Sequence, residues 1–137
     1  MKENSVFPKG VKASSEIFTG NAYVNMLVAD NNKQYNTTVY DVIFEKGARN
    51  NWHTHSQGQI LLITAGKGFY QERGQKAKLL QVGDVVDIPA NVEHWHGATE
   101  DSSFTHIGIT PKVAENDTKW GDTVSEEEYF LAIKENK

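Results

Sequence analysis

Short runs of alternating hydrophobic and polar positions recur along the chain, and turn residues separate them. In the clearest run, residues 37–44, one set of alternate positions is large or β-branched, whereas an aspartate interrupts the other set. Side chains at positions i and i+2 of a strand point to the same side of a sheet, so one face of this run can be buried. We expect that face to consist of Thr38, Tyr40, Val42 and Phe44.

The remaining runs have the length of ordinary strands and end at glycine, asparagine or aspartate. Turn residues at 30–32, 66–68 and 74–75 divide several of them. Strands are expected at residues 22–29, 37–44, 59–65, 69–73, 76–80, 85–88, 92–96 and 103–110. Short strands at such regular spacing, with no helix between them, predict an all-β fold built as a closed barrel or as two antiparallel sheets.

The two ends of the chain depart from this pattern. Residues 1–16 are polar and contain a Pro-Lys-Gly turn, so we expect an arm that is ordered only where it docks. Near the C-terminus, Ser125 and Glu128 have capping-box spacing and predict a short helix on the outside of the β-structure or on a partner. The alternative for the last residues is a frayed tail. We expect one domain, 1–137, made of the arm, a barrel at about 17–111 and a C-terminal segment at 112–137.

Length and composition restrict the classes of function. A chain of 137 residues can bury a sufficient hydrophobic core without a disulfide or a structural metal to stabilise it. Its net charge of −4, with scattered lysines and arginines, makes nucleic acid and anionic membranes unexpected partners. It has no cysteine for a disulfide or thiolate ligand, and no apolar run long enough to span a membrane. We expect a soluble cytoplasmic protein that acts on a small molecule.

The chemistry of the chain is concentrated in its histidines. His53 and His55 share one face of a strand, and a Ser-Gln-Gly turn returns Gln59 toward them. A second same-face pair follows at His94 and His96, and His106 lies in the next strand. One H-x-H pair alone could be two surface histidines. All five histidines lie between positions 53 and 106, however, which favours one transition-metal site.

These residues resemble the two motifs of the cupins. The first motif, G-x5-H-x-H-x3-4-E-x6-G, is matched by Gly47, His53, His55, Gln59 and Gly66, with glutamine in place of the usual glutamate. The resemblance implies a jelly-roll barrel, also called a double-stranded β-helix. The short C-terminal helix predicted above would be an addition to that barrel.

The second cupin motif, G-x5-P-x-G-x2-H-x3-N, is matched by Gly83, Pro89 and His94. Asn91 replaces its second glycine and Ala98 replaces its final asparagine. Asn91 is a mild departure, because asparagine tolerates a positive φ better than other non-glycine residues do.

Within the cupins, the chain is most similar to the small bacterial manganese-dependent hydroxynitrile lyases, which split or form cyanohydrins. The shared strings are W-H-T-H at 52–55, Q-I-L-L-I-T-A-G at 59–66, H-W-H-G at 94–97 and T-H at 105–106. The resemblance implies a divalent metal held by His53, His55, Gln59 and His94. Mn²⁺ is expected, although Fe²⁺, Co²⁺, Ni²⁺ and Zn²⁺ suit the same ligand types.

Gln59 is the important departure from the common cupin pattern. A neutral ligand leaves the full +2 charge on the metal, which strengthens it as a Lewis acid. The alternative is that Gln59 is only a turn residue beside a three-histidine site.

His96 and His106 are the expected general acid and base. Alternatively, His96 is a fifth ligand or points past the barrel rim, and His106 is a hydrogen-bonded core residue. The expected reaction deprotonates a substrate hydroxyl and breaks a carbon–carbon bond to cyanide or a similar carbanion. A metal-dependent oxygenase and a non-catalytic binding module are the two other functions that fit these motifs.

The substrate pocket is expected to be lined by Tyr40, Val42 and Thr110. Tyr40 is bulkier than the small residue of the lyases that the chain resembles, which narrows the room for an aromatic substrate. We also expect a homodimer or higher homo-oligomer, because Trp95 should be exposed on the face opposite His94, and Trp120 adds further aromatic surface.

Overall fold

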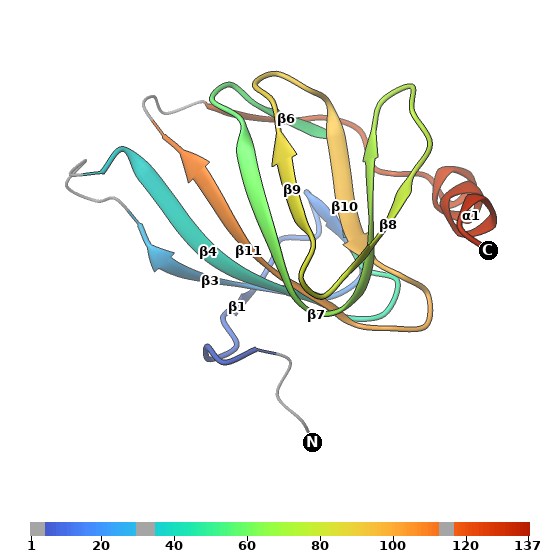
Figure 1. Cartoon of the computed structure of the whole chain (residues 1–137), viewed down its shortest axis with the longest axis horizontal. Helices are drawn as coiled ribbons and strands as arrows, with labels where there is room; N and C mark the ends of the chain where they lie inside the picture. The colour runs from blue at the N-terminus through green and yellow to red at the C-terminus, as the bar shows by residue number, and fades with distance from the viewer. Residues whose placement is uncertain (1–4, 30–34, 113–116) are drawn as a thin grey trace.

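The computed structural model describes residues 5–29, 35–112 and 117–137. In this part of the chain the strands curl into a barrel-like sheet, and one helix lies outside it (Figure 1). The all-β class and the C-terminal helix are therefore confirmed. The elements are β1 (Val11–Lys12), β2 (Phe18–Thr19), β3 (Ala22–Val28), β4 (Thr37–Phe44), β5 (Arg49–Asn50), β6 (His53–His55), β7 (Gln59–Glu72), β8 (Lys78–Gln81), β9 (Val85–Ile88), β10 (His94–Ala98), β11 (Phe104–Pro111), β12 (Thr118–Trp120) and α1 (Glu126–Glu135).

All the strand pairs are antiparallel, along the path β1-β3-β4-β11-β7-β10-β5-β2. The long strand β7 joins the two halves of the sheet, because its first part pairs with β11 and β9 and its second part with β10 and β8. Strand β10 also pairs with β6, which sets His94 opposite His53. The topology thus brings the two histidine-bearing strands together.

Strand β7 corrects one expectation. The glycines at 66–68 were expected to end a strand, but β7 runs unbroken through them. Gly66 has φ +72°, and a Cβ there would overlap the main chain at Ser103. A Cβ at Gly68 would come within 2.5 Å of the Gly97 carbonyl oxygen. These glycines therefore allow the neighbouring strands to approach closely, which the sequence pattern alone cannot distinguish from a turn.

The interior of the barrel is filled by the inward faces of the strands. The predicted inward face of β4 is confirmed, since Val42 and Phe44 are buried and Thr38 and Tyr40 line the same cavity. The buried members of this inner core are Phe18, Ala22, Val42, Phe44, Ala48, Leu61, Ile63, Tyr70, Leu80, Ile88, Ala98 and Phe104.

A second core lies between the outer face of the sheet and α1, and we call it the outer core. Its buried members are Trp52, Phe69, Ala77, Trp95, Val124, Tyr129 and Ala132. Trp95 was expected to be exposed, but α1 and its neighbours bury it completely. The aromatic-surface argument for a homodimer therefore keeps only Trp120, which is 42% exposed. The homodimer stays a prediction.

Helix α1 begins with the capping box that the sequence predicts. The Ser125 hydroxyl accepts from the Glu128 N–H, and the Glu128 carboxylate accepts from the Ser125 N–H at 2.8 Å. Tyr129 packs inward and donates to the Ala98 carbonyl oxygen at 2.6 Å. No helix in the described residues is long and apolar enough to cross a membrane.

The described part of the N-terminal arm docks on the sheet. Strand β1 pairs with β3, and the Ser5 hydroxyl donates to the Asp41 carboxylate at 3.0 Å. Asp41, on the outward face of β4, is buried. Residues 1–4 and the turn expected at 30–32 lie outside the described residues.

Candidate metal centre

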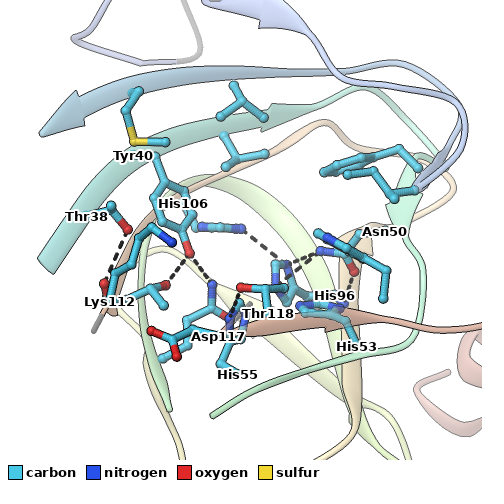
Figure 2. A pocket seen from close by; sticks show the side chains of 18 of the residues that line it. Thr38, Tyr40, Asn50, His53, His55, His96, His106, Lys112, Asp117 and Thr118 are labelled. Carbon is cyan, nitrogen blue, oxygen red and sulfur yellow. Dashed lines mark hydrogen bonds between the residues drawn. The ribbon is translucent and has the colours of Figure 1, made fainter. Parts of the chain in front are cut away.

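A cavity of about 430 Å³ is lined by inward-facing residues of the barrel strands. Four of the five histidines line it, together with Gln59 and the three predicted pocket residues Tyr40, Val42 and Thr110 (Figure 2). The fifth histidine, His94, stands against His53, with the ring centroids 4.3 Å apart. The predicted chemistry therefore gathers in one place.

His53 and His55 point inward from alternate positions of β6, and hydrogen bonds on Nδ1 orient both rings. His53 Nδ1 donates to the Asn51 carbonyl oxygen at 2.7 Å, and His55 Nδ1 lies 3.0 Å from the Thr118 hydroxyl. Such bonds fix the ring orientation of metal-binding histidines. His55 Nε2 is buried and has no hydrogen-bond partner among the described residues, which suits a nitrogen that ligates a metal.

His94 and Gln59 approach from the other side. His94 Nδ1 donates to the Val92 carbonyl oxygen at 2.9 Å, which leaves Nε2 facing Gln59 Oε1 at 3.3 Å. Gln59 follows the expected turn, in which Gly58 has φ +82°. The other end of the Gln59 amide donates to the Tyr40 hydroxyl. An amide oxygen and imidazole nitrogens are thus brought together, and this donor set suits a divalent transition metal.

The tightest group of possible ligand atoms differs from the predicted set. One nitrogen each of His53, His94 and His96 lie within 4.8 Å of one another, the one such group among the described residues. The His55 ring is slightly further away, with its centroid 5.0 Å from that of His53 and 5.6 Å from that of His94. The four predicted ligands are therefore neighbours, and His96 lies among them.

His96 and His106 form a buried pair behind the ligands. His106 Nε2 lies 3.2 Å from His96 Nδ1, and the His106 side chain faces the cavity. The Asn50 side chain accepts from the His96 main-chain N–H at 2.9 Å, and its amide nitrogen lies 3.3 Å from His96 Nε2. Sequence reasoning gave Asn50 no role, although it lies just before the first histidine pair.

Burial determines the charge state of these imidazoles. It lowers the pKa of His55 to about 4 and that of His106 to about 3. Burial, followed by repulsion from neighbouring imidazoles, holds the pKa of His53 and His96 well below its usual value. The pKa of His94 is lowered by burial as well. All five rings are therefore neutral near pH 7, the form in which imidazole binds a metal.

The side wall of the cavity carries a second polar cluster. The Tyr40 hydroxyl lies 2.5 Å from the Thr110 hydroxyl, in addition to its bond with Gln59. Burial raises the pKa of Tyr40, so the phenol keeps its proton. Val42 lies beside Tyr40 on the same face of β4 and is buried. Tyr40 thus lines the cavity beside Gln59.

The C-terminal segment lines the cavity with Thr118 and Trp120, which sequence reasoning missed. Strand β12 pairs with β6, which sets Thr118 opposite His55 and Trp120 opposite His53. The Trp120 ring lies against His53, with centroids 4.5 Å apart and an interplanar angle of 31°. A three-residue strand has no periodic signal that could have predicted this pairing.

A family model described as "Cupin domain" matches residues 40–108. This chain belongs to the cupins. The curled sheet is accordingly the cupin jelly-roll barrel that the motifs predicted. A cupin-like protein from Thermotoga maritima has a solved structure that is 55% identical, with a TM-score of 0.91 over 93% of this chain and 96% of that one.

Two relatives of this chain carry names that describe a reaction. The (R)-mandelonitrile lyase of Granulicella tundricola is 40% identical over 88 residues, which are 64% of this chain and 67% of that protein. The acireductone dioxygenase of Trichormus variabilis is 37% identical over 60 residues. That match spans 41% of this chain and only 33% of the dioxygenase.

Proposed function

We propose that this cupin is a metal-dependent lyase that cleaves or forms a carbon–carbon bond in a small hydroxylated substrate such as a cyanohydrin. The observation that carries the proposal is the set of five neutral imidazoles and one amide converging at a single cavity. Because these six side chains carry no negative charge, a divalent metal among them keeps its full charge. The similarity to the (R)-mandelonitrile lyase supports the same class of reaction.

The proposed ligands are His53, His55, Gln59 and His94. Three features support this set over one that includes His96. Each of the three proposed histidines has its Nδ1 within 3.0 Å of an oxygen. His55 Nε2 has no other partner among the described residues. Both ring nitrogens of His96, in contrast, lie within 3.4 Å of the Asn50 amide nitrogen.

We propose Mn²⁺ as the resident ion, and Fe²⁺, Co²⁺, Ni²⁺ and Zn²⁺ suit the same donors. When bound, such an ion supplies Lewis acidity that lowers the pKa of a substrate hydroxyl.

The proposed proton transfers use His96 and His106. One imidazole accepts the hydroxyl proton as the carbon–carbon bond breaks, so that the oxygen becomes a carbonyl and the bonding electrons leave with cyanide. The imidazolium then returns the proton to cyanide, and hydrogen cyanide is released. The 3.2 Å contact between His106 Nε2 and His96 Nδ1 supports this role, because a proton can pass between the two rings.

The cavity walls support a small substrate. The apolar side chains of Val24, Val42 and Phe44 line the same cavity as the histidines. Tyr40 occupies the wall beside Gln59, so a compact aliphatic cyanohydrin fits this proposal better than a bulky aromatic one.

A metal-dependent oxygenase is the second candidate function, and the match to the acireductone dioxygenase favours it. It would use the same ligands with redox-active iron and would consume dioxygen.

Elemental analysis and paired assays test these proposals. The protein is loaded with Mn²⁺ or Fe²⁺ and assayed with aliphatic and aromatic cyanohydrins, with and without dioxygen. The lyase proposal expects cyanide release that does not depend on oxygen, stops with a chelator and returns with metal. Turnover that requires dioxygen would instead support the oxygenase, and metal binding without turnover would support a binding module.

A further inference from the structure

The Tyr40 hydroxyl stands between two polar partners on the cavity wall. Figure 2 shows two hydrogen bonds meeting at this oxygen. One is donated by the Gln59 amide nitrogen, and the other joins the Thr110 hydroxyl at 2.5 Å. The Gln59 amide oxygen faces the opposite way and lies 3.3 Å from His94 Nε2.

A glutamine ligand has an orientation problem that a glutamate ligand does not have. The oxygen and the NH₂ group of an amide are nearly the same size, yet only the oxygen has lone pairs to offer. A half-turn of the amide would present two N–H donors to the metal site instead. The two oxygens of a glutamate are equivalent, so the same rotation would change nothing.

The direction in which Tyr40 donates its hydroxyl proton determines which end of the Gln59 amide faces His94. The phenol hydroxyl of Tyr40 has one proton to donate and lone pairs to accept with. If Thr110 accepts this proton, the Tyr40 oxygen is left as an acceptor and selects the N–H end of Gln59. If Tyr40 instead donated to Gln59, the amide would turn its NH₂ group toward His94.

We propose that Tyr40, with Thr110 as its acceptor, is a positioning residue that holds the amide oxygen of Gln59 toward the metal. The inference rests on the proposed function, which assigns Gln59 as a ligand. It extends that assignment to a hydrogen-bonded chain running from Thr110 through Tyr40 to Gln59. An outer partner of this kind contributes to metal affinity by orienting a ligand without touching the metal.

A double-mutant cycle on Mn²⁺ binding tests this role. Affinity is measured by calorimetry or chelator competition for the wild type, Tyr40→Phe, Gln59→Glu and the double variant. Removal of an orienting partner typically weakens metal affinity by about 10-fold or more, and we expect this loss for Tyr40→Phe beside the native glutamine. In the Gln59→Glu background the loss should be below about 2-fold, because a carboxylate needs no orientation.

Two further variants sharpen the test. Thr110→Val removes the proposed acceptor but keeps the Tyr40 hydroxyl, and it should also weaken Mn²⁺ binding only beside Gln59. Tyr23→Phe is the matched control. Its hydroxyl donates to the Glu45 carboxylate at 3.3 Å on an exposed part of the neighbouring strand, so Mn²⁺ affinity should not change.

Other outcomes would overturn the inference in distinguishable ways. Equal losses of Mn²⁺ affinity on Tyr40→Phe beside glutamine and beside glutamate would mean that Tyr40 acts only through packing. No loss of affinity in either background would mean that Tyr40 does not position the ligand. In both cases an intact wild-type affinity would leave the metal site standing. A wild-type protein that binds no Mn²⁺ and none of the other ions would overturn the site itself, and the Tyr40 inference with it.

Discussion

Neighbouring side chains on the same two strands have opposite surroundings in this cupin. His94 and His96 of β10 point into the barrel, whereas Trp95 between them points outward and packs beneath α1. The same contrast separates His53, the first residue of β6, from Trp52 just before the strand. The inner face carries the proposed chemistry, and the outer face is an aromatic core.

The contrast shows how the imidazoles are held in place. Trp95 donates to the Gln71 side chain at 2.9 Å, and the Arg73 guanidinium lies 3.8 Å from the centre of the Trp52 ring. These contacts fix the backbone from outside, while hydrogen bonds on Nδ1 orient the rings of His53, His55 and His94 from inside. A site preorganised by a rigid scaffold needs little rearrangement when a metal binds.

The largest expected effect comes from removing the outer core while leaving the inner face intact. Trp95→Ala should lower the free energy of unfolding by about 3–5 kcal/mol, because it leaves a cavity beneath α1. Chemical denaturation of the metal-free protein measures the loss. At denaturant concentrations below its unfolding midpoint, the folded variant should still bind Mn²⁺. If Trp95→Ala lost Mn²⁺ binding but kept its free energy of unfolding, the outer face would not be separate from the metal site on the inner face.

Removing an inner ligand should have the reverse result. His94→Ala should weaken metal binding by more than about 100-fold, which exceeds the usual cost of losing an outer partner. His53→Ala should do the same, whereas His96→Ala and His106→Ala should retain nearly all of the metal. Elemental analysis after dialysis makes this comparison. Metal loss in His106→Ala would contradict the proposed ligand set.

Gln59→Glu should change reactivity without disturbing either core. The variant should hold metal at least as well as the wild type, because carboxylate is the stronger ligand. The added charge should reduce Lewis acidity, and the loss of one pKa unit of activation costs about 1.4 kcal/mol, or about tenfold in rate. Cyanohydrin cleavage at equal metal occupancy measures the effect. Wild-type activity in this variant would mean that the neutral ligand is incidental.

The smallest effect is expected at Asp41, on the outward face of β4. Burial raises the pKa of the Asp41 carboxyl group, so ionisation opposes folding as the pH rises through its folded-state pKa. Asp41→Asn should therefore be slightly more stable than the wild type at pH 7. The difference should disappear well below the ordinary aspartate pKa of about 3.9, where the carboxyl is protonated in both states. Denaturant unfolding at several pH values tests this, and a stability loss at pH 7 would mean that the Ser5 contact outweighs burial.

Much of this arrangement could be predicted because alternation is a local property. Thr38, Tyr40, Val42 and Phe44 line the cavity as their spacing requires. Asn91, in place of a motif glycine, has φ +66°, the conformation that its side chain tolerates. The capping box at Ser125 likewise depends only on residues three apart in sequence.

Features that depend on distant partners could not be predicted in this way. Strand alternation alone predicts that Trp95 faces outward and is exposed, because it does not show that α1 covers that face. The sequence around Gly66 predicts a turn, because it does not show that the main chain at Ser103 lies against this glycine. The bond between Tyr40 and Gln59 joins two strands that are not consecutive along the chain, so no sequence spacing could have indicated it.

The pairing of β12 with β6 has a consequence for the order of assembly during synthesis. Thr118 meets His55 Nδ1 across 63 positions of sequence. All five histidines therefore leave the ribosome before the residue that orients one of them. A nascent chain ending before Thr118 already contains every proposed ligand, but its His55 ring lacks that anchor. Firm retention of metal should therefore be a late event, completed only when the last strand has joined the sheet.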